Sequence, residues 1–255
     1  MITLLSDWKL RDPYIGIFKG QLLQYLPEAT MVDITHHLEL FNLPQTAFIA
    51  KNSYKFFPEK SLHIILSGLS FSADIKPVLV IHDGHFFLGE DTGVFSMMFG
   101  HENAVEAFQY NGDMSLSSTE KIACMASWVF QGVYVENTLP YPTLKFQLSN
   151  LSEPYYNKEQ KTISGKIVYI DSNCNAVTNV PASMFEGVGR RAFTATVSNV
   201  RSLKITRYQA YYNSQELEVF FVKNRLGLLE ITLYKGNIAA LADIRVGDDV
   251  EIKFE

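Results

Sequence analysis

The sequence predicts an α/β domain followed by a smaller β domain. Short apolar runs alternate with helix-like stretches through the first part of the chain, which is typical of a layered, mainly parallel sheet. After Pro140 and Pro142 the pattern changes to short strands separated by turns. We therefore predict an N-terminal α/β domain over residues 1–150, a polar linker over 151–162 and a β-barrel-like domain over 163–255.

In the first domain, five apolar segments are predicted strands: Ile2–Leu5, Met31–Ile34, Leu62–Leu66, Val78–Ile81 and Phe86–Leu88. Three longer segments are predicted helices: Pro13–Leu26, Pro44–Phe56 and Ser117–Phe130. Pro13 suits the first turn of a helix, where a backbone N–H has no partner to lose. Ser117 and Glu120 have the spacing of a capping box. Asp83-Gly84 predicts a hairpin, so the sheet is expected to be locally antiparallel there.

In the second domain the predicted strands are shorter and lie close together. They are Gly165–Ile170, Ala192–Val197, Glu216–Lys223, Gly227–Leu233 and Asp249–Phe254. Ile238–Leu241 is predicted to form a short turn before the last strand. Because helical periodicity is scarce here, a compact β-barrel is favoured.

Composition narrows the class of protein. The chain has 255 residues, 47% of them hydrophobic, which is enough for a sizeable core. The net charge of −5 and the absence of a basic run argue against nucleic-acid binding. No apolar run is long enough to span a membrane and no signal peptide is recognisable. The two cysteines lie in different segments, so we expect a reducing, cytoplasmic setting without disulfides.

Asp7 and Asp12 directly follow the first predicted strand. The carboxyl end of a strand in an open α/β sheet is a common ligand site. These carboxylates therefore suit ribose hydroxyls or an amino group of a ligand. The alternative is that they cap the following helix.

His36 and His37 follow the second predicted strand. Neighbouring residues of an extended segment point to opposite faces, and nothing nearby completes a tetrahedral site, so we predict no metal. The sequence also lacks a glycine-rich phosphate loop and a serine hydrolase elbow.

Two turns of the second domain carry polar side chains. Asp171 to Asn175 reads as an Asx-rich turn or as a polar clamp for a ligand. Asn224 and Arg225 lie in a hairpin turn. An inward carboxylate at Glu230 would need a partner such as Lys223 or Arg225.

Six short motifs occur in order along nearly the whole chain. They are S-D-x-x-x-x-D-P-Y-x-G-x-x-K-G from Ser6, V-D-I-T-H from Val32, F-F-P-x-x-x-x-H from Phe56, G-x-D-x-G from Gly89, I-D-x-x-x-N-x-x-T-N from Ile170 and N-x-x-G-x-L-E-I from Asn224. Each motif is weak alone, but the set resembles the S-adenosyl-L-methionine (SAM) hydroxide adenosyltransferases. The SAM-dependent fluorinase and chlorinase are related to them.

The resemblance implies a homotrimer that binds SAM between the N-terminal domain of one subunit and the C-terminal domain of its neighbour. Water or halide attacks the ribose 5′ carbon and methionine leaves. SAM is then substrate or ligand, and no further cofactor is implied. By resemblance, Asp7 holds the ribose hydroxyls, Asp12 and Asp171 face the methionine amino group, and Asn175 meets the adenine edge. Asn224 and Arg225 lie near the methionine carboxylate or adenine.

The sequence departs from the family at the water-activating positions. Hydroxide-transferring members use an Asp, an Arg and a His, and the corresponding residues here are Gly68, Ile75 and Ser117. A stacking aromatic is replaced by Asn173. The halogenases work with small polar groups around an anion, so Ser67, Ser70 and Ser117 are candidates for such a pocket.

Three functions are compatible with this pattern. The first is SAM hydrolysis to adenosine and methionine, and the second is catalytically silent binding of SAM or adenosine. The third is action on a different nucleophile or nucleoside ligand.

Overall fold

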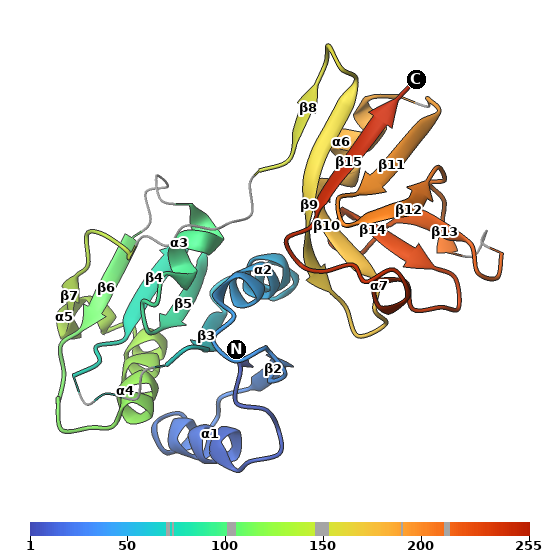
Figure 1. Cartoon of the computed structure of the whole chain (residues 1–255). Helices are drawn as coiled ribbons and strands as arrows, with labels where there is room; N and C mark the ends of the chain where they lie inside the picture. The colour runs from blue at the N-terminus through green and yellow to red at the C-terminus, as the bar shows by residue number, and fades with distance from the viewer. Residues whose placement is uncertain (70–71, 73, 101–105, 146–152, 190, 212–214) are drawn as a thin grey trace. The chain divides into compact units, whose positions relative to one another are not determined.

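The computed structural model describes all residues except 70, 71, 73, 101–105, 146–152, 190 and 212–214. The chain divides into two compact units, Met1–Leu148 and Ser149–Glu255 (Figure 1). In the described residues, no helix has both the length and the apolar character needed to cross a membrane.

Unit 1 contains a seven-stranded sheet in the order β2-β1-β3-β5-β4-β6-β7. Its strands are β1 (Ile2–Ser6), β2 (Met31–Thr35), β3 (Leu62–Leu66), β4 (Val78–His82), β5 (His85–Gly89), β6 (Glu106–Tyr110) and β7 (Thr138–Pro140). Its helices are α1 (Tyr14–Tyr25), α2 (Leu43–Ser53), α3 (Val94–Phe99), α4 (Ser118–Gln131) and α5 (Tyr134–Asn137), with a 3₁₀ turn, η1, at Tyr54–Phe56.

The sheet lies between two helical layers, as Figure 1 shows. Ile2 and Leu4 of β1 pack with α1 and α4, whereas Leu5 packs with α2 and α3. Every residue of β1 is buried, which is expected of a strand covered on both faces. The predicted α/β class is thus confirmed, and its layers place the loop after β1 at the edge of the sheet.

The sheet is mixed rather than mainly parallel. Strands β2, β1, β3 and β5 pair in parallel, whereas β4 pairs antiparallel with β5 and β6, and β7 antiparallel with β6. The predicted Asp83-Gly84 hairpin is confirmed and starts this reversal. Both residues have positive φ, 52° and 74°, as a tight hairpin turn requires.

Unit 2 contains an antiparallel sheet in the order β12-β11-β15-β9-β10-β14-β13. Its strands are β8 (Tyr155–Asn157), β9 (Thr162–Ile170), β10 (Ala176–Pro181), β11 (Phe193–Val197), β12 (Val200–Ile205), β13 (Val219–Lys223), β14 (Leu228–Leu233) and β15 (Asp249–Phe254). Among the described residues of this unit, two short helices, α6 (Ala182–Gly187) and α7 (Ile238–Leu241), accompany the strands.

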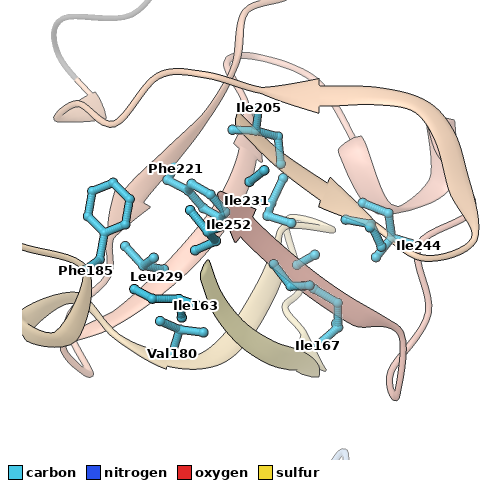
Figure 2. Close-up of a cluster of buried hydrophobic side chains, with 14 of the residues drawn as sticks. Ile163, Ile167, Val180, Phe185, Ile205, Phe221, Leu229, Ile231, Ile244 and Ile252 are labelled. Carbon is cyan, nitrogen blue, oxygen red and sulfur yellow. The ribbon is translucent and has the colours of Figure 1, made fainter. Parts of the chain in front are cut away.

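The sheet of unit 2 curls around one apolar core. Figure 2 shows Ile163, Ile167, Phe221, Ile231 and Ile252 converging from different strands. A bridge between Tyr208, beyond β12, and Phe221 of β13 joins the two ends of the strand order. The β-barrel-like prediction is therefore confirmed.

Several elements differ from the sequence prediction. Part of the predicted linker over 151–162 is ordered, since β8 pairs with β9 there. Strand β9 begins at Thr162 and runs through Gly165, where a Cβ would lie 2.4 Å from Val180 Cγ2. The glycine therefore permits close packing and does not start the strand. The sequence prediction lacked β6, β7, β8, β10 and β12, all of six residues or fewer.

Candidate functional site

Asp7 occupies the carboxyl end of the parallel part of the unit 1 sheet. It follows β1 directly, and β1 pairs with β3 so that Ser6 lies beside Leu66. The loops that leave these two strands therefore emerge side by side. This is the edge at which open α/β sheets bind ligands.

The Asp7 carboxylate is buried, with 4% of the residue exposed, and it is held by donors. Its Oδ2 accepts hydrogen bonds from the backbone N–H groups of Gly68 (3.1 Å) and Phe41 (3.2 Å) and from Ser67 Oγ (3.3 Å). Buried carboxylates need such partners, and these three all meet one oxygen. The other oxygen, Oδ1, makes none of these three bonds.

Gly68 is the position at which the hydroxide-transferring pattern has an aspartate. Its φ is +69°, and a Cβ would lie 3.2 Å from Leu43 Cδ2. A side chain here would strain the backbone. The loop instead uses its backbone N–H to hold Asp7.

A cavity of about 950 Å³ opens beside Asp7. It is lined by the loop after β1, by helix α1, by Leu40 and by the start of α4, and its polar lining includes Asp7, Asp12, Gln21, Ser117 and Glu120. Such a volume lies within the ~300–1,000 Å³ of small-molecule pockets. The structure thus brings Asp7, Asp12 and Ser117 together at one cavity.

The two aspartates do not cap helix α1. The cap residue is Pro13, and it makes no side-chain capping hydrogen bond. The alternative explanation of Asp7 and Asp12 as helix caps is therefore wrong.

Ser117 is the N-cap of α4 and forms the predicted capping box with Glu120. Glu120 Oε2 accepts from the Ser117 N–H (2.8 Å) and from Ser117 Oγ (2.5 Å). These bonds lower the pKa of Glu120. Ser117 therefore has a structural role in addition to its place in the cavity wall.

The other serine candidates and Ile75 lie elsewhere. Ser67 is buried between Thr46 and Asp7 and supports the carboxylate. Ser70 lies outside the described residues. Ile75 is buried and borders a separate cavity of about 330 Å³, and its carbonyl accepts from Lys121 Nζ at 3.3 Å.

In unit 2, the loop between β9 and β10 directs several hydrogen-bond donors to the carboxylate of Asp171. Its Oδ1 accepts from the backbone N–H groups of Asn173 (2.9 Å) and Asn175 (2.8 Å), and its Oδ2 accepts from Asn175 Nδ2 (3.2 Å). The predicted Asx-rich turn is confirmed. Asn175 is buried, and its Oδ1 accepts from Thr232 Oγ1 at 2.8 Å.

Asn224 and Arg225 border a cavity of unit 2, of about 510 Å³. Tyr208, Tyr211 and Glu230 also line it. Asn224 Oδ1 accepts from the N–H groups of Leu226 (3.0 Å) and Leu228 (3.1 Å), which fixes the hairpin turn. The hydroxyl of Tyr208 bonds Glu186, and burial raises the pKa of Tyr208 to about 12.

Glu230 has amide partners, whereas the sequence suggested Lys223 or Arg225. Burial raises the pKa of Glu230, and hydrogen bonds from Asn224 and Asn175 oppose that rise. Lys223 instead lies 4.0 Å from Glu186. Sequence spacing could not reveal this, because Asn175 and Glu230 meet only through the pairing of β10 with β14.

The side chain of His36, after β2, has structural partners. His36 Nδ1 lies 2.8 Å from Ser6 Oγ, and its Nε2 lies 3.1 Å from Asp33 Oδ1. In the part of the chain that the structure describes, no group of three or more His, Cys, Asp or Glu side chains is arranged to hold a metal.

Fold and sites define a class: an α/β unit with a carboxylate-lined cavity at the carboxyl edge of its sheet, and a β-barrel-like unit with its own cavity, which Arg225 and Glu230 border. The N-terminal domain model of the SAM hydroxide adenosyltransferases matches residues 2–132, and their C-terminal domain model matches residues 165–251. The chain belongs to this family.

Individual relatives agree with the assignment. The chain is 21% identical to the (R)-S-adenosyl-L-methionine hydrolase of Methanocaldococcus jannaschii over 99% of this chain and 95% of that protein. It is 25% identical to the enzyme of the same name from Thermus thermophilus over 38% of this chain and 37% of that one.

Solved structures share the fold. An uncharacterised conserved protein from Thermotoga maritima has a TM-score of 0.87 at 20% identity, covering 99% of this chain and 100% of that one. A conserved hypothetical protein from Thermus thermophilus has a TM-score of 0.75 at 19% identity, covering 98% of each chain.

Proposed function

We propose that this protein cleaves SAM to adenosine and methionine. The observation that carries the proposal is the cavity that unites Asp7 and Asp12 in a chain of this family. Two relatives named SAM hydrolases support it.

In the proposed complex, Asp7 binds the ribose diol. Its Oδ2 is engaged by Gly68, Phe41 and Ser67, so its Oδ1 is oriented toward the ligand. Asp12, exposed at the cavity wall, faces the methionine ammonium. The carboxylates thus hold the sugar and the amino acid on either side of the reacting carbon.

The reaction is a displacement at the ribose 5′ carbon. A water oxygen forms the new C–O bond, the C–S bond breaks, and its electron pair stays on the methionine sulfur. The positive sulfonium becomes a neutral thioether, and the proton of the attacking water passes to solvent. Because the leaving group is neutral, positioning of water and carbon supplies a large part of the acceleration.

The cavities of the two units are proposed to meet between neighbouring copies in a homotrimer. Asp171, Asn175, Asn224 and Arg225 then complete the ligand site from the C-terminal unit. Three exposed apolar side chains line the first cavity, and their exposure supports a partner surface that covers its rim: Tyr14 (60%), Ile17 (55%) and Leu40 (65%). Sedimentation of the full chain tests the trimer. A monomer at micromolar concentration would contradict it.

We also propose a cytoplasmic setting. Cys124 and Cys174 are both free, as expected in a reducing compartment.

Silent binding of SAM or adenosine is the second candidate, favoured by Gly68, Ile75 and Ser117 at the water-activating positions. Incubation with SAM, followed by chromatography of adenosine and methionine, separates the two functions. Cleavage predicts equimolar products above the level of the Asp7→Ala variant. Calorimetric binding of SAM without products would support the silent binder.

A further inference from the structure

Glu230 is a buried carboxylate at the wall of the unit 2 cavity. It lies in β14, opposite Val222 of β13 and Val177 of β10, and is 8% exposed. It lines the cavity together with Tyr208, Tyr211 and Arg225. A carboxylate in the middle of an apolar strand is costly to bury unless it has hydrogen-bond partners. The kind of partner that Glu230 has therefore indicates what the side chain does.

Both partners of Glu230 are oriented as donors. Asn224 Oδ1 is occupied by two backbone N–H groups, so its NH₂ group is the end that turns to Glu230. Asn175 Oδ1 is occupied by Thr232 Oγ1, and its NH₂ group, which donates one N–H to Asp171 Oδ2 at 3.2 Å, offers the other to Glu230. The Thr232 proton is used in that bond, and Tyr211 Oη therefore donates to Thr232 at 2.9 Å. The network is built to hold a hydrogen-bond acceptor at position 230.

The charge of this acceptor is not balanced by a cation. None of the ion pairs found among the described residues includes Glu230, and Lys223 pairs with Glu186. Asp171 nearby is also acidic. A carboxylate has about four lone-pair positions, and the two amides fill only part of them. Capacity remains for a donor that arrives in the cavity.

We propose that Glu230 is a specificity-determining residue, whose carboxylate accepts a hydrogen bond from an amino group of the bound ligand. This inference rests on the proposed function. SAM offers two such groups, the 6-amino group of its purine and its α-ammonium. Both share the chemistry of a nitrogen donor, and the cavity selects ligands that carry it.

The test is calorimetric titration of the full chain and its Glu230→Gln variant with SAM, adenosine, inosine and methionine. The glutamine keeps size and shape but can present an NH₂ group in place of an acceptor. SAM affinity is expected to fall about 10-fold or more. Glu251→Gln is the matched control, since Glu251 is exposed on β15, and it should bind as the wild type does.

The smaller ligands identify the source of the donor. If the purine amine is bound, wild type prefers adenosine to inosine, whose 6-oxo group is an acceptor, and the variant loses that preference. If the ammonium is bound, the variant loses methionine and keeps its purine preference. If circular dichroism shows that Glu230→Gln does not fold, Glu230→Asp is used instead. The aspartate retains the charge, but its shorter side chain moves the carboxylate oxygens away from the cavity.

Two outcomes overturn the inference. In the first, a folded variant at position 230 binds SAM within twofold of the wild-type affinity, which would show that Glu230 does not take part in ligand recognition. Cleavage of SAM by the wild type would still support the proposed function in that case. In the second, the wild type does not bind SAM, which would contradict both the role of Glu230 and the proposed function.

Discussion

The two units hold the buried carboxylates of their cavities, Asp7 and Glu230, with different kinds of donor. All six histidines lie in unit 1, where burial lowers the pKa of His63 and of His85, whereas unit 2 has none. Asp7 of unit 1 is bound largely by backbone N–H groups, whereas Glu230 of unit 2 is bound by side-chain amides. The donors to Asp7 that belong to the backbone are fixed by the fold of two loops, whereas the donors to Glu230 belong to side chains that border a cavity. This suggests an anchoring role for unit 1 and a discriminating role for unit 2.

The largest expected effect is that of Asp7→Asn on ligand binding. The amide oxygen can replace Oδ2 and keep the three donors, which leaves an NH₂ group in place of Oδ1 toward the cavity. The charge-assisted bonds to the ribose are then lost, about 1.5–3 kcal/mol, or ~10- to 150-fold in affinity. Calorimetry with SAM measures it. Equal affinity would mean that Asp7 is only a loop anchor.

The next effect is an acid sensitivity confined to unit 1. Burial lowers the pKa of His63 to about 3, and His85 adds to the shift. Below pH 6.5 the unfolded chain binds more protons than the folded one, so stability is complete above pH 6.5 and falls with acid. By pH 5 the loss is about 2 kcal/mol.

Urea unfolding followed by tryptophan fluorescence measures this loss, because Trp8 and Trp128 both lie in unit 1. Unit 2, followed by the amide hydrogen exchange of its strands, should not lose stability over the same range. Burial raises the pKa of Glu230, so its protonation is favoured in the folded state and acid stabilises this unit slightly. Equal losses in both units would contradict the comparison.

Gly68→Ala tests the hydrogen bond from the Gly68 backbone N–H to the Asp7 carboxylate. A left-handed alanine costs about 1–2 kcal/mol, and here its Cβ also meets Leu43. Gly84→Ala is the matched control, with φ +74° and open space around its Cβ. Both variants should lose stability, but only Gly68→Ala should also weaken SAM binding. Identical SAM affinity in the two variants would contradict a link between the backbone conformation at Gly68 and ligand binding by Asp7.

The smallest effect concerns the α4 cap. Ser117→Ala removes the N-cap and should cost about 1 kcal/mol in urea unfolding. Glu120→Gln should be nearly neutral, since glutamine also completes a capping box. An equally large loss in Glu120→Gln would assign the stabilisation to its charge.

The sequence predicted what depends on local pattern. Apolar residues before Asp7 predict that it lies at a strand end, and Asp83-Gly84 predicts a turn because glycine adopts positive φ freely and aspartate tolerates it. Strand β10 was not predicted, since the Asx-rich turn before it dominates the local pattern. The partners of Glu230 follow from strand pairing, which no local spacing encodes. Likewise, the hydrogen bond from Gly68 to Asp7 forms only because β1 and β3 are neighbours in the sheet, which the local sequence does not encode.

The central claim is that water displaces methionine from a ligand held by Asp7. The most direct test is turnover of SAM in H₂¹⁸O with mass spectrometry of the products. The account predicts adenosine carrying one ¹⁸O at its 5′ position and unlabelled methionine, with product formation reduced in Asp7→Asn. Unlabelled adenosine, or no adenosine above the Asp7→Asn level, would contradict it.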